Sequence, residues 1–338
     1  MQLEKTHETD LEKVQHKEFR YLQHNLLDVD DLSKREIEDI LQNALAMKEV
    51  LGRDIKKVPT LRGKTIITLF HEASTRTRVS FEQAGKILSA DVINVSGSGS
   101  SVEKGESIYN TALTLQAMNA DIIVIRHPHS GAPHFLARHL DASIINAGDG
   151  MHAHPTQSLL DLYTIQSRFN KIEGLKIAIV GDILHSRVAR SNLWAFTKMG
   201  AHIIVCAPPT LLPRDLLPAA DSKHDKHPFS SVRVETQLDN ALEGADVVMA
   251  LRLQKERQQA GLLPTLREYS NLYGITEERL AHAKPNVIVM HPGPINEGVE
   301  IDTDVAHGSR SVIEEQVKNG VAVRMALLHK VANNRRSI

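Results

Sequence analysis

The sequence predicts an α/β protein with two doubly wound parallel-sheet domains that are joined by interdomain helices. Short runs rich in β-branched residues alternate along the chain with segments of helical spacing. Runs such as 121–125 and 177–180 are apolar on both faces, as strands are when helices cover both sides of a parallel sheet. The length of 338 residues suits two domains of ordinary size rather than one.

The expected elements follow in order from a polar extension at residues 1–24, which carries little pattern. A helix is expected over 32–51, with Ser33 as its cap and with apolar residues on one face at Ile37, Ile40, Leu41 and Ala44. Strands are expected near 65–70, 92–95, 121–125 and 143–146, and then near 175–180, 202–206, 232–235, 246–250 and 286–290.

The boundary between the two domains is expected at a helix that starts near Pro155, because proline suits a first helical turn. The first domain would cover residues 25–155 and the second residues 156–310. A C-terminal helix over 311–338 would complete the first domain. Its apolar residues form one stripe: Ile313, Val317, Val321, Met325 and Leu328.

Composition excludes several classes of protein. Lys plus Arg (40) nearly cancels Asp plus Glu (41), so the chain lacks the basic field of a nucleic-acid binder. The lone Cys206 lies in an apolar run, which indicates a buried structural thiol in a reducing compartment. The charged N-terminus and the absence of a long apolar run predict a cytoplasmic protein that does not bind a membrane.

Residues 71–82 carry the strongest functional signal, and they follow the expected strand at 65–70. The segment Ser74–Arg78 reads Ser-Thr-Arg-Thr-Arg and opens a helix in which Ser74 is a natural N-cap. The free N–H groups of a first helical turn, three hydroxyls and the Arg76 guanidinium would converge there. Such a site can hold a phosphate without a glycine loop or a metal ion. When any single part of this pattern is taken alone, the alternative to a phosphate site is an ordinary capped helix with an exposed basic turn.

Further basic and polar residues follow other expected strands, where ligands of doubly wound sheets collect. Arg126, Arg187 and Arg252 each lie at or just beyond the end of a strand. The segments His154–Gln157 and His291–Pro294 follow strands in the same way. Together with Arg76, these arginines indicate a substrate with several negative charges.

These motifs together resemble the aspartate/ornithine transcarbamylase superfamily over about 25–331, and within it the aspartate branch. The segments Ser74–Arg78 and His154–Gln157 look like the shared carbamoyl-phosphate signatures. The aspartate branch is indicated by 104–106, 252–257 and 291–294. The ornithine branch would carry a cysteine near the last of these segments, whereas Cys206 is the only cysteine here.

The resemblance implies transfer of the carbamoyl group from carbamoyl phosphate to L-aspartate, an early step of pyrimidine (UMP) biosynthesis, without a cofactor or a metal ion. Residues 25–155 would then bind carbamoyl phosphate and 156–310 would bind aspartate. Two sets of residues are implied. The carbamoyl-phosphate set is Ser74, Thr75, Arg76, Thr77, Arg126, His154, Gln157, Pro292, Gly293 and Pro294, with Arg76, Thr77, Arg126 and His154 also catalytic. The aspartate set is Lys104, Arg187, Arg252 and Gln254.

The resemblance also implies a homotrimer or a larger assembly in which Lys104, with Ser100 or Ser101, reaches into a neighbouring subunit. A solvated charge beside Glu103 and Glu106 is the alternative for Lys104. A regulatory chain or a dihydroorotase is a possible partner. Glu297 stands where many relatives have a basic residue, but outside the ligand set.

Other functions explain the same residues less well. A nicotinamide-dependent oxidoreductase would explain Gly181-Asp182 after a strand, but the segment lacks Gly-x-Gly-x-x-Gly. A transcarbamylase for ornithine or another amine conflicts with Arg252, and a non-catalytic assembly subunit conflicts with the retained arginines. Histidine pairs resemble metal ligands but lack supporting cysteines or a His-Glu-x-x-His pattern: His127/His129, His152/His154 and His224/His227.

Overall fold

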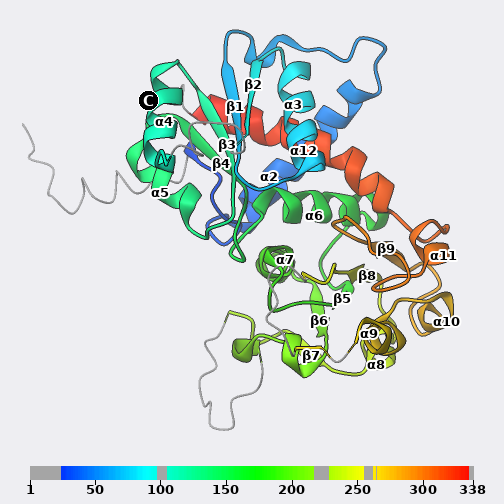
Figure 1. Ribbon diagram of the computed structural model, residues 1–338. Coiled ribbons are helices and arrows are strands. Elements are labelled where there is room, and N and C mark those ends of the chain that lie inside the picture. The colour runs from blue at the N-terminus through cyan, green and yellow to red at the C-terminus, as the bar shows by residue number, and fades with distance from the viewer. Residues whose placement is uncertain (1–23, 97–104, 217–227, 255–261, 264, 335–338) are drawn as a thin grey trace, which may run out of the picture.

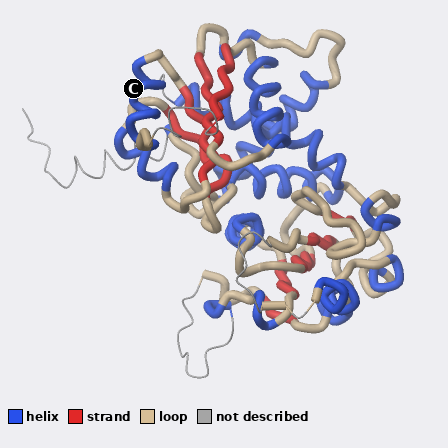
Figure 2. The backbone as a smooth tube through the Cα atoms, in the orientation of Figure 1, coloured by secondary structure: helices blue, strands red, loops and turns tan. Residues whose placement is uncertain are grey.

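The computed structural model describes residues 24–96, 105–216, 228–254, 262–263 and 265–334. Two sheets lie in separate halves of the molecule, and helices pack around and between them (Figures 1 and 2). All paired strands within both sheets are parallel. The predicted fold class is therefore confirmed.

The first sheet has the strand order β2-β1-β3-β4. Its strands are β1 (Thr65–Phe70), β2 (Asp91–Ser96), β3 (Ile122–His127) and β4 (Ser143–Asp149). Alternate residues of β1 and β3 point into two different apolar clusters. Ile66 and Val124 lie in one cluster, and Ile67 and Ile123 lie in the other. Both faces are therefore covered, which explains the continuous apolar runs.

Two groups of helices supply this cover. The cluster that contains Ile66 also takes in residues of α2 (Lys34–Leu51), α3 (Thr75–Ile87) and α12 (Ile313–Asn334). The opposite cluster contains residues of α4 (Ile108–Ala117) and α5 (Ala132–His139). Helix α2 begins after Ser33, whose side chain forms the predicted cap as part of a capping box with Glu36.

The second sheet has the strand order β7-β6-β5-β8-β9. Its strands are β5 (Lys176–Val180), β6 (His202–Cys206), β7 (Arg233–Glu235), β8 (Val247–Ala250) and β9 (Ile288–Met290). The helices of this half are α7 (Arg187–Lys198), α8 (Leu238–Leu242), α9 (Leu266–Tyr273), α10 (Glu277–Leu280) and α11 (Thr303–Ala306). Every strand expected from the sequence is present within a few residues of its predicted bounds.

Two helices join the halves. Helix α6 (Pro155–Phe169) starts at the predicted proline, and α12 packs against α2, α3 and α6 (Figure 1). Part of the predicted stripe on α12 is wrong, because Val317 is 51% exposed whereas Val321, Met325 and Leu328 are buried. Val317 instead lines a cavity between the halves.

Two strands run further than their apolar residues predicted. Strand β3 includes Arg126, which pairs with Phe70 of β1, and β4 continues to Asp149, which pairs with His127. Neighbouring strands satisfy the backbone of these polar residues, so pairing continues past the apolar run. Cys206 is buried as expected, and burial raises the pKa of its thiol to about 12.

Among the described residues, no helix is both long enough and apolar enough to span a membrane.

Candidate functional site

A cavity of about 770 Å³ lies between the two halves of the molecule. In each sheet the strand order reverses at one place, between β1 and β3 in the first sheet and between β5 and β8 in the second. Segments that follow β1, β5 and β8, and the end of β3, all contribute residues to the cavity. Ligands of doubly wound folds bind at such switch points, so the topology by itself marks this place.

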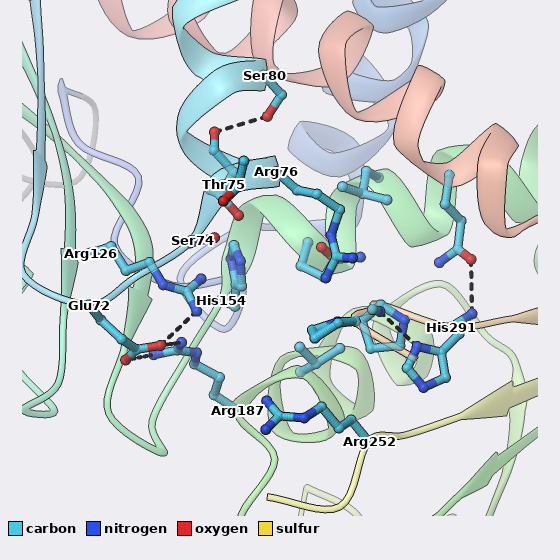
Figure 3. A pocket seen from close by; sticks show the side chains of 18 of the residues that line it. Glu72, Ser74, Thr75, Arg76, Ser80, Arg126, His154, Arg187, Arg252 and His291 are labelled. Carbon is cyan, nitrogen blue, oxygen red and sulfur yellow. Dashed lines mark hydrogen bonds and ion pairs between the residues drawn. The ribbon is translucent and has the colours of Figure 1, made fainter. Parts of the chain in front are cut away.

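The first turn of α3 forms one wall. Ser74 is the N-cap residue in extended conformation, and its side chain makes no capping hydrogen bond. Ser74, Thr75, Arg76 and Thr77 all line the cavity, and Figure 3 shows the first three close together. Free N–H groups at a helix start attract anions, and the cap hydroxyl can serve the same ligand. The residues that the sequence predicts to hold a phosphate are therefore contiguous and line one wall of the cavity.

Opposite this turn, two arginines converge on one carboxylate. Arg126 Nη2 donates to Glu72 Oε1 at 2.6 Å, and Arg187 Nη1 donates to Glu72 Oε2 at 3.1 Å (Figure 3). Arg187 Nη2 also donates to Glu72 Oε1. Sequence analysis missed Glu72 as a site residue, although it stands two positions before Ser74. Its proximity to the phosphate motif was the available signal.

The two guanidinium groups lie against Gly148 in β4. A Cβ atom on Gly148 would come within 3.0 Å of Arg187 Cζ and 3.3 Å of Arg126 Nη1. The φ of this residue is +117°, a conformation that side chains rarely adopt. Glycine at this position therefore lets the arginines of both halves approach the sheet edge.

His154 is the N-cap residue of α6 and is only 4% exposed. Burial, reinforced by the charges of Arg126 and Arg187, lowers the pKa of His154 well below its usual value. Its imidazole is therefore neutral at pH 7. Its backbone N–H donates to Ser191 Oγ at 2.9 Å, which fixes the start of α6 against α7. A neutral imidazole can donate one hydrogen bond without carrying a charge into the cavity.

One turn further along α6, Gln157 is oriented by a buried carboxylate. Gln157 Nε2 donates to Asp161 Oδ1 at 3.0 Å, so its amide oxygen remains as an acceptor for a ligand. Asp161 also accepts from Asn192 of α7 and from Gln316 of α12. This network joins the cavity to three helices, and no pattern in the sequence revealed it.

The segment after β9 closes the cavity beside Arg76. A Cβ atom on Gly293 would lie 2.5 Å from Arg76 Cζ and 2.6 Å from Arg76 Nη2, and the φ of Gly293 is +63°. The Gly293 N–H donates to His291 Nδ1 at 2.7 Å, and the Gly293–Pro294 peptide is cis. Gly293 thus lets this loop lie directly against the guanidinium group. Pro292 and Pro294 line the cavity on both sides of it.

Arg252 and Gln254 follow β8 and line the part of the cavity that belongs to the second half. Asp182, two residues after β5, organises this region. It accepts from the Gln254 N–H at 3.2 Å and from His185 Nδ1 at 2.8 Å. Asp182, which together with Gly181 had suggested a nicotinamide-dependent oxidoreductase in the sequence, therefore anchors the loop that carries Arg252 and Gln254.

The structure also places residues that the sequence analysis had missed or set aside. Arg324 of α12 is 4% exposed and lines the cavity, with its guanidinium over the Phe81 ring at 5.2 Å. Burial lowers its pKa to about 10. Glu297 pairs with His307 at 3.2 Å and lies outside the cavity lining. Ser100, Ser101 and Lys104 lie outside the described residues.

Comparisons with known proteins agree with this arrangement. Residues 24–167 match the family described as "Aspartate/ornithine carbamoyltransferase, carbamoyl-P binding domain", and residues 173–331 match its "Asp/Orn binding domain". The chain belongs to the aspartate/ornithine carbamoyltransferase family. The resemblance seen in the motifs is thereby confirmed.

Several relatives named as aspartate carbamoyltransferases are similar to this chain over most of its length. An aspartate carbamoyltransferase catalytic subunit of Roseiflexus sp. (strain RS-1) is 60% identical over 308 residues, which cover 91% of this chain and 95% of the relative. The aspartate transcarbamoylase of Trypanosoma cruzi in complex with carbamoyl phosphate and aspartate is 30% identical, with a TM-score of 0.81 and coverage of 91% and 96%. The catalytic subunit of M. jannaschii aspartate transcarbamoylase is 35% identical, with a TM-score of 0.79 and coverage of 93% and 100%.

Proposed function

We propose that this protein is a transferase that forms N-carbamoyl-L-aspartate and phosphate from carbamoyl phosphate and L-aspartate, in pyrimidine (UMP) biosynthesis. The observation that carries the proposal is the convergence of Ser74–Thr77 with Arg126, Arg187 and Arg252 in one cavity. This cavity gathers positive charge and anion donors from both halves of the molecule. Two anionic substrates would repel each other in water, and these groups offset that repulsion. Relatives named for this reaction support the assignment.

The reaction needs no nucleophilic side chain. The aspartate amine attacks the carbonyl carbon of carbamoyl phosphate, a C–N bond forms, and the C–O bond to phosphate breaks. The departing phosphate takes the amine proton. Holding the two substrates in a reactive orientation can contribute roughly 7–11 kcal/mol to catalysis.

Each side of the cavity has its own role in this proposal. Ser74, Thr75, Arg76 and Thr77 hold the phosphate. Thr77, Arg126 and neutral His154 donate to the carbonyl oxygen as charge develops on it. The Gln157 oxygen, fixed by Asp161, accepts from the amino group, as do the backbone carbonyls at Pro292 and Gly293, with Pro294 beside them. Arg187, Arg252 and Gln254 bind the aspartate carboxylates, together with Lys104.

The domain limits follow the same assignment. Residues 25–155 with the C-terminal helix form the carbamoyl-phosphate domain, and residues 156–310 form the aspartate domain. The protein acts in the cytoplasm as a homotrimer or larger assembly. Ser100 and Lys104 complete the site of a neighbouring subunit, and a regulatory chain or a dihydroorotase is a further partner.

An assay of the purified protein tests the reaction directly. Carbamoyl phosphate with L-aspartate should give carbamoyl-aspartate, whereas carbamoyl phosphate with ornithine should give no citrulline. Product from ornithine alone would overturn the assignment to aspartate. It would favour the alternative in which the second substrate is another amine.

Hybrid trimers test the shared site. Lys104→Gln and Arg76→Ala chains should each be nearly inactive as pure assemblies. After dissociation and joint reassembly, some interfaces would pair an intact Lys104 with an intact Arg76 and regain activity. If well-formed hybrids stay inactive, the site is built within one chain.

A further inference from the structure

A second cluster of ligating side chains lies outside the cavity, where β4 leads into α6. His134 belongs to α5, Asp149 is the last residue of β4, and His152 lies in the following loop. Ligand atoms of these three residues all lie within 4.8 Å of one another. We propose that they form a binding site for one divalent transition-metal ion such as zinc. This departs from the expectation of no metal ion, which rested on the family resemblance and on the lack of supporting cysteines or a His-Glu-x-x-His pattern.

The donor set suits such an ion. Two imidazoles and one carboxylate, with a fourth position left to water, form a common zinc ligand set. Tetrahedral coordination with bonds of about 2.0–2.2 Å separates ligand atoms by roughly 3.3–3.6 Å. His152 Nδ1 already lies 3.1 Å from Asp149 Oδ2. The His134 and His152 rings meet edge to face with centroids 5.5 Å apart, and the ligand atoms of all three residues lie within 4.8 Å of one another.

The surroundings of the cluster resemble the outer shell of a metal site. A metal-bound histidine usually gives its other ring N–H to a carboxylate. His152 has this arrangement, because Nδ1 faces Asp149 while Nε2 lies 3.3 Å from Asp28 Oδ2. Asp149 is held in turn, since it accepts from Asn146 Nδ2 at 2.9 Å and from the Gly131 N–H at 2.7 Å.

The cluster is buried at Asp149 but partly open to solvent at His152, and carboxylates lie near it. Asp149 is fully buried, whereas the His152 side chain is 34% exposed, so an ion could enter and keep a water ligand. Asp30 and Asp31 contribute negative potential at the histidines. A cation is therefore favoured there over an anion.

A bound ion would brace the loop that leads to His154. Gly150, next to Asp149, accepts from Arg187 Nη1 at 3.2 Å through its carbonyl oxygen. This segment thus contacts Arg187 and also carries two of the three candidate ligands, Asp149 and His152. The ion would act as a structural clamp beside the cavity and would not enter the reaction.

Cobalt titration of the full chain, stripped with a chelator, tests the site. Co²⁺ bound by nitrogen and carboxylate ligands in a low-coordinate site gives visible absorption bands, and these should saturate at one ion per chain. Zn²⁺ should displace Co²⁺, and its Kd is measured by calorimetry. His134→Ala should abolish the bands while leaving the bonds among Asp28, Asp149 and His152 in place. Asp28→Asn should weaken Zn²⁺ binding about 10- to 100-fold.

His282→Ala is the matched control, because His282 is exposed and remote from the cluster. It should bind Co²⁺ and Zn²⁺ as the unmodified chain does, and circular dichroism should show all three variants folded. The absence of a saturable Co²⁺ signal in the unmodified chain would overturn the proposal. Equal Zn²⁺ affinity of His134→Ala and the unmodified chain would also overturn it, because the ions would then bind other histidines.

Discussion

The two sides of the cavity are built in different ways. The side proposed to hold phosphate, Ser74–Thr77 (the phosphate side), is one stretch of chain at the start of α3. The side proposed to hold aspartate, with Arg187, Arg252 and Gln254 (the aspartate side), comes from segments after two strands of the second sheet. Backbone geometry creates the first side locally, whereas Glu72, Gly148 and Asp182 hold the second side in place through tertiary contacts. A local site should lose binding when one side chain is removed, and an assembled site should also respond to changes at a distance.

The largest effect is expected on the phosphate side. Arg76→Ala should weaken carbamoyl-phosphate binding by about 1000-fold, because it removes two charge-assisted hydrogen bonds of roughly 2 kcal/mol each. Calorimetry measures the loss. Arg78→Ala, on the same helix but outside the cavity lining, should bind normally. Unchanged affinity in Arg76→Ala would show that the phosphate binds elsewhere.

At the junction of the two sides, His154→Ala should lower kcat on the order of 100- to 1000-fold and weaken carbamoyl-phosphate binding much less. The histidine contact would strengthen only as charge develops on the carbonyl oxygen. Because the pKa of His154 is lowered well below its usual value, protonation of His154 should not reduce activity near pH 6.5.

Steady-state kinetics and binding measurements separate these effects for His154. His129→Ala is a suitable control, because His129 is exposed and absent from the cavity lining. Equal losses in kcat and in binding would mean that His154 only positions the substrate.

A smaller effect is expected where the loop after β9 meets the phosphate side. Gly293→Ala should weaken carbamoyl-phosphate binding about tenfold, because its Cβ would displace the Arg76 guanidinium. Gly298→Ala is a matched control, since Gly298 also has a positive φ but a Cβ added there would meet nothing within 4 Å. Both variants carry similar backbone strain of about 1–2 kcal/mol. Similar phosphate affinity in the two variants would rule out the steric argument.

The smallest effect concerns the buried network behind Gln157. Burial raises the pKa of Asp161 to about 6, and hydrogen bonds from Asn192 and Gln316 limit that rise. Asp161 therefore binds its proton more tightly in the folded chain than in the unfolded chain. Its contribution to stability is full below about pH 4 and is lost as the pH rises through about 6.

Urea unfolding at several pH values tests this linkage. Relative to Asp161→Asn, the unmodified chain should lose up to about 2–3 kcal/mol of stability between pH 4 and pH 6. Parallel curves for the two proteins would mean that Asp161 titrates normally in the folded state.

Much of the fold could be read from the sequence because parallel strands that are buried on both faces leave continuous apolar runs. The strands of both sheets and the start of α6 were predicted in this way. The ends of β3 and β4 were not, because neighbouring strands, rather than apolar side chains, extend the pairing to His127 and Asp149. Val317 fits the helical period of α12 but lines the cavity. The period identifies one side of a helix, but it does not reveal which turns of that side are covered by other elements.

From the sequence alone, Ser74–Thr77 could be predicted to bind a phosphate and the substrates could be predicted to be anionic. A helix start with hydroxyls and a guanidinium needs only a few consecutive residues, and arginines after strands indicate an anionic ligand. How these parts meet depends on the packing of the folded chain. Glu72 joins Arg126 to Arg187, Asp161 orients Gln157, and His134 reaches Asp149 and His152 because folding brings distant segments together. Such contacts depend on packing across helices and sheets, which local spacing along the chain does not encode.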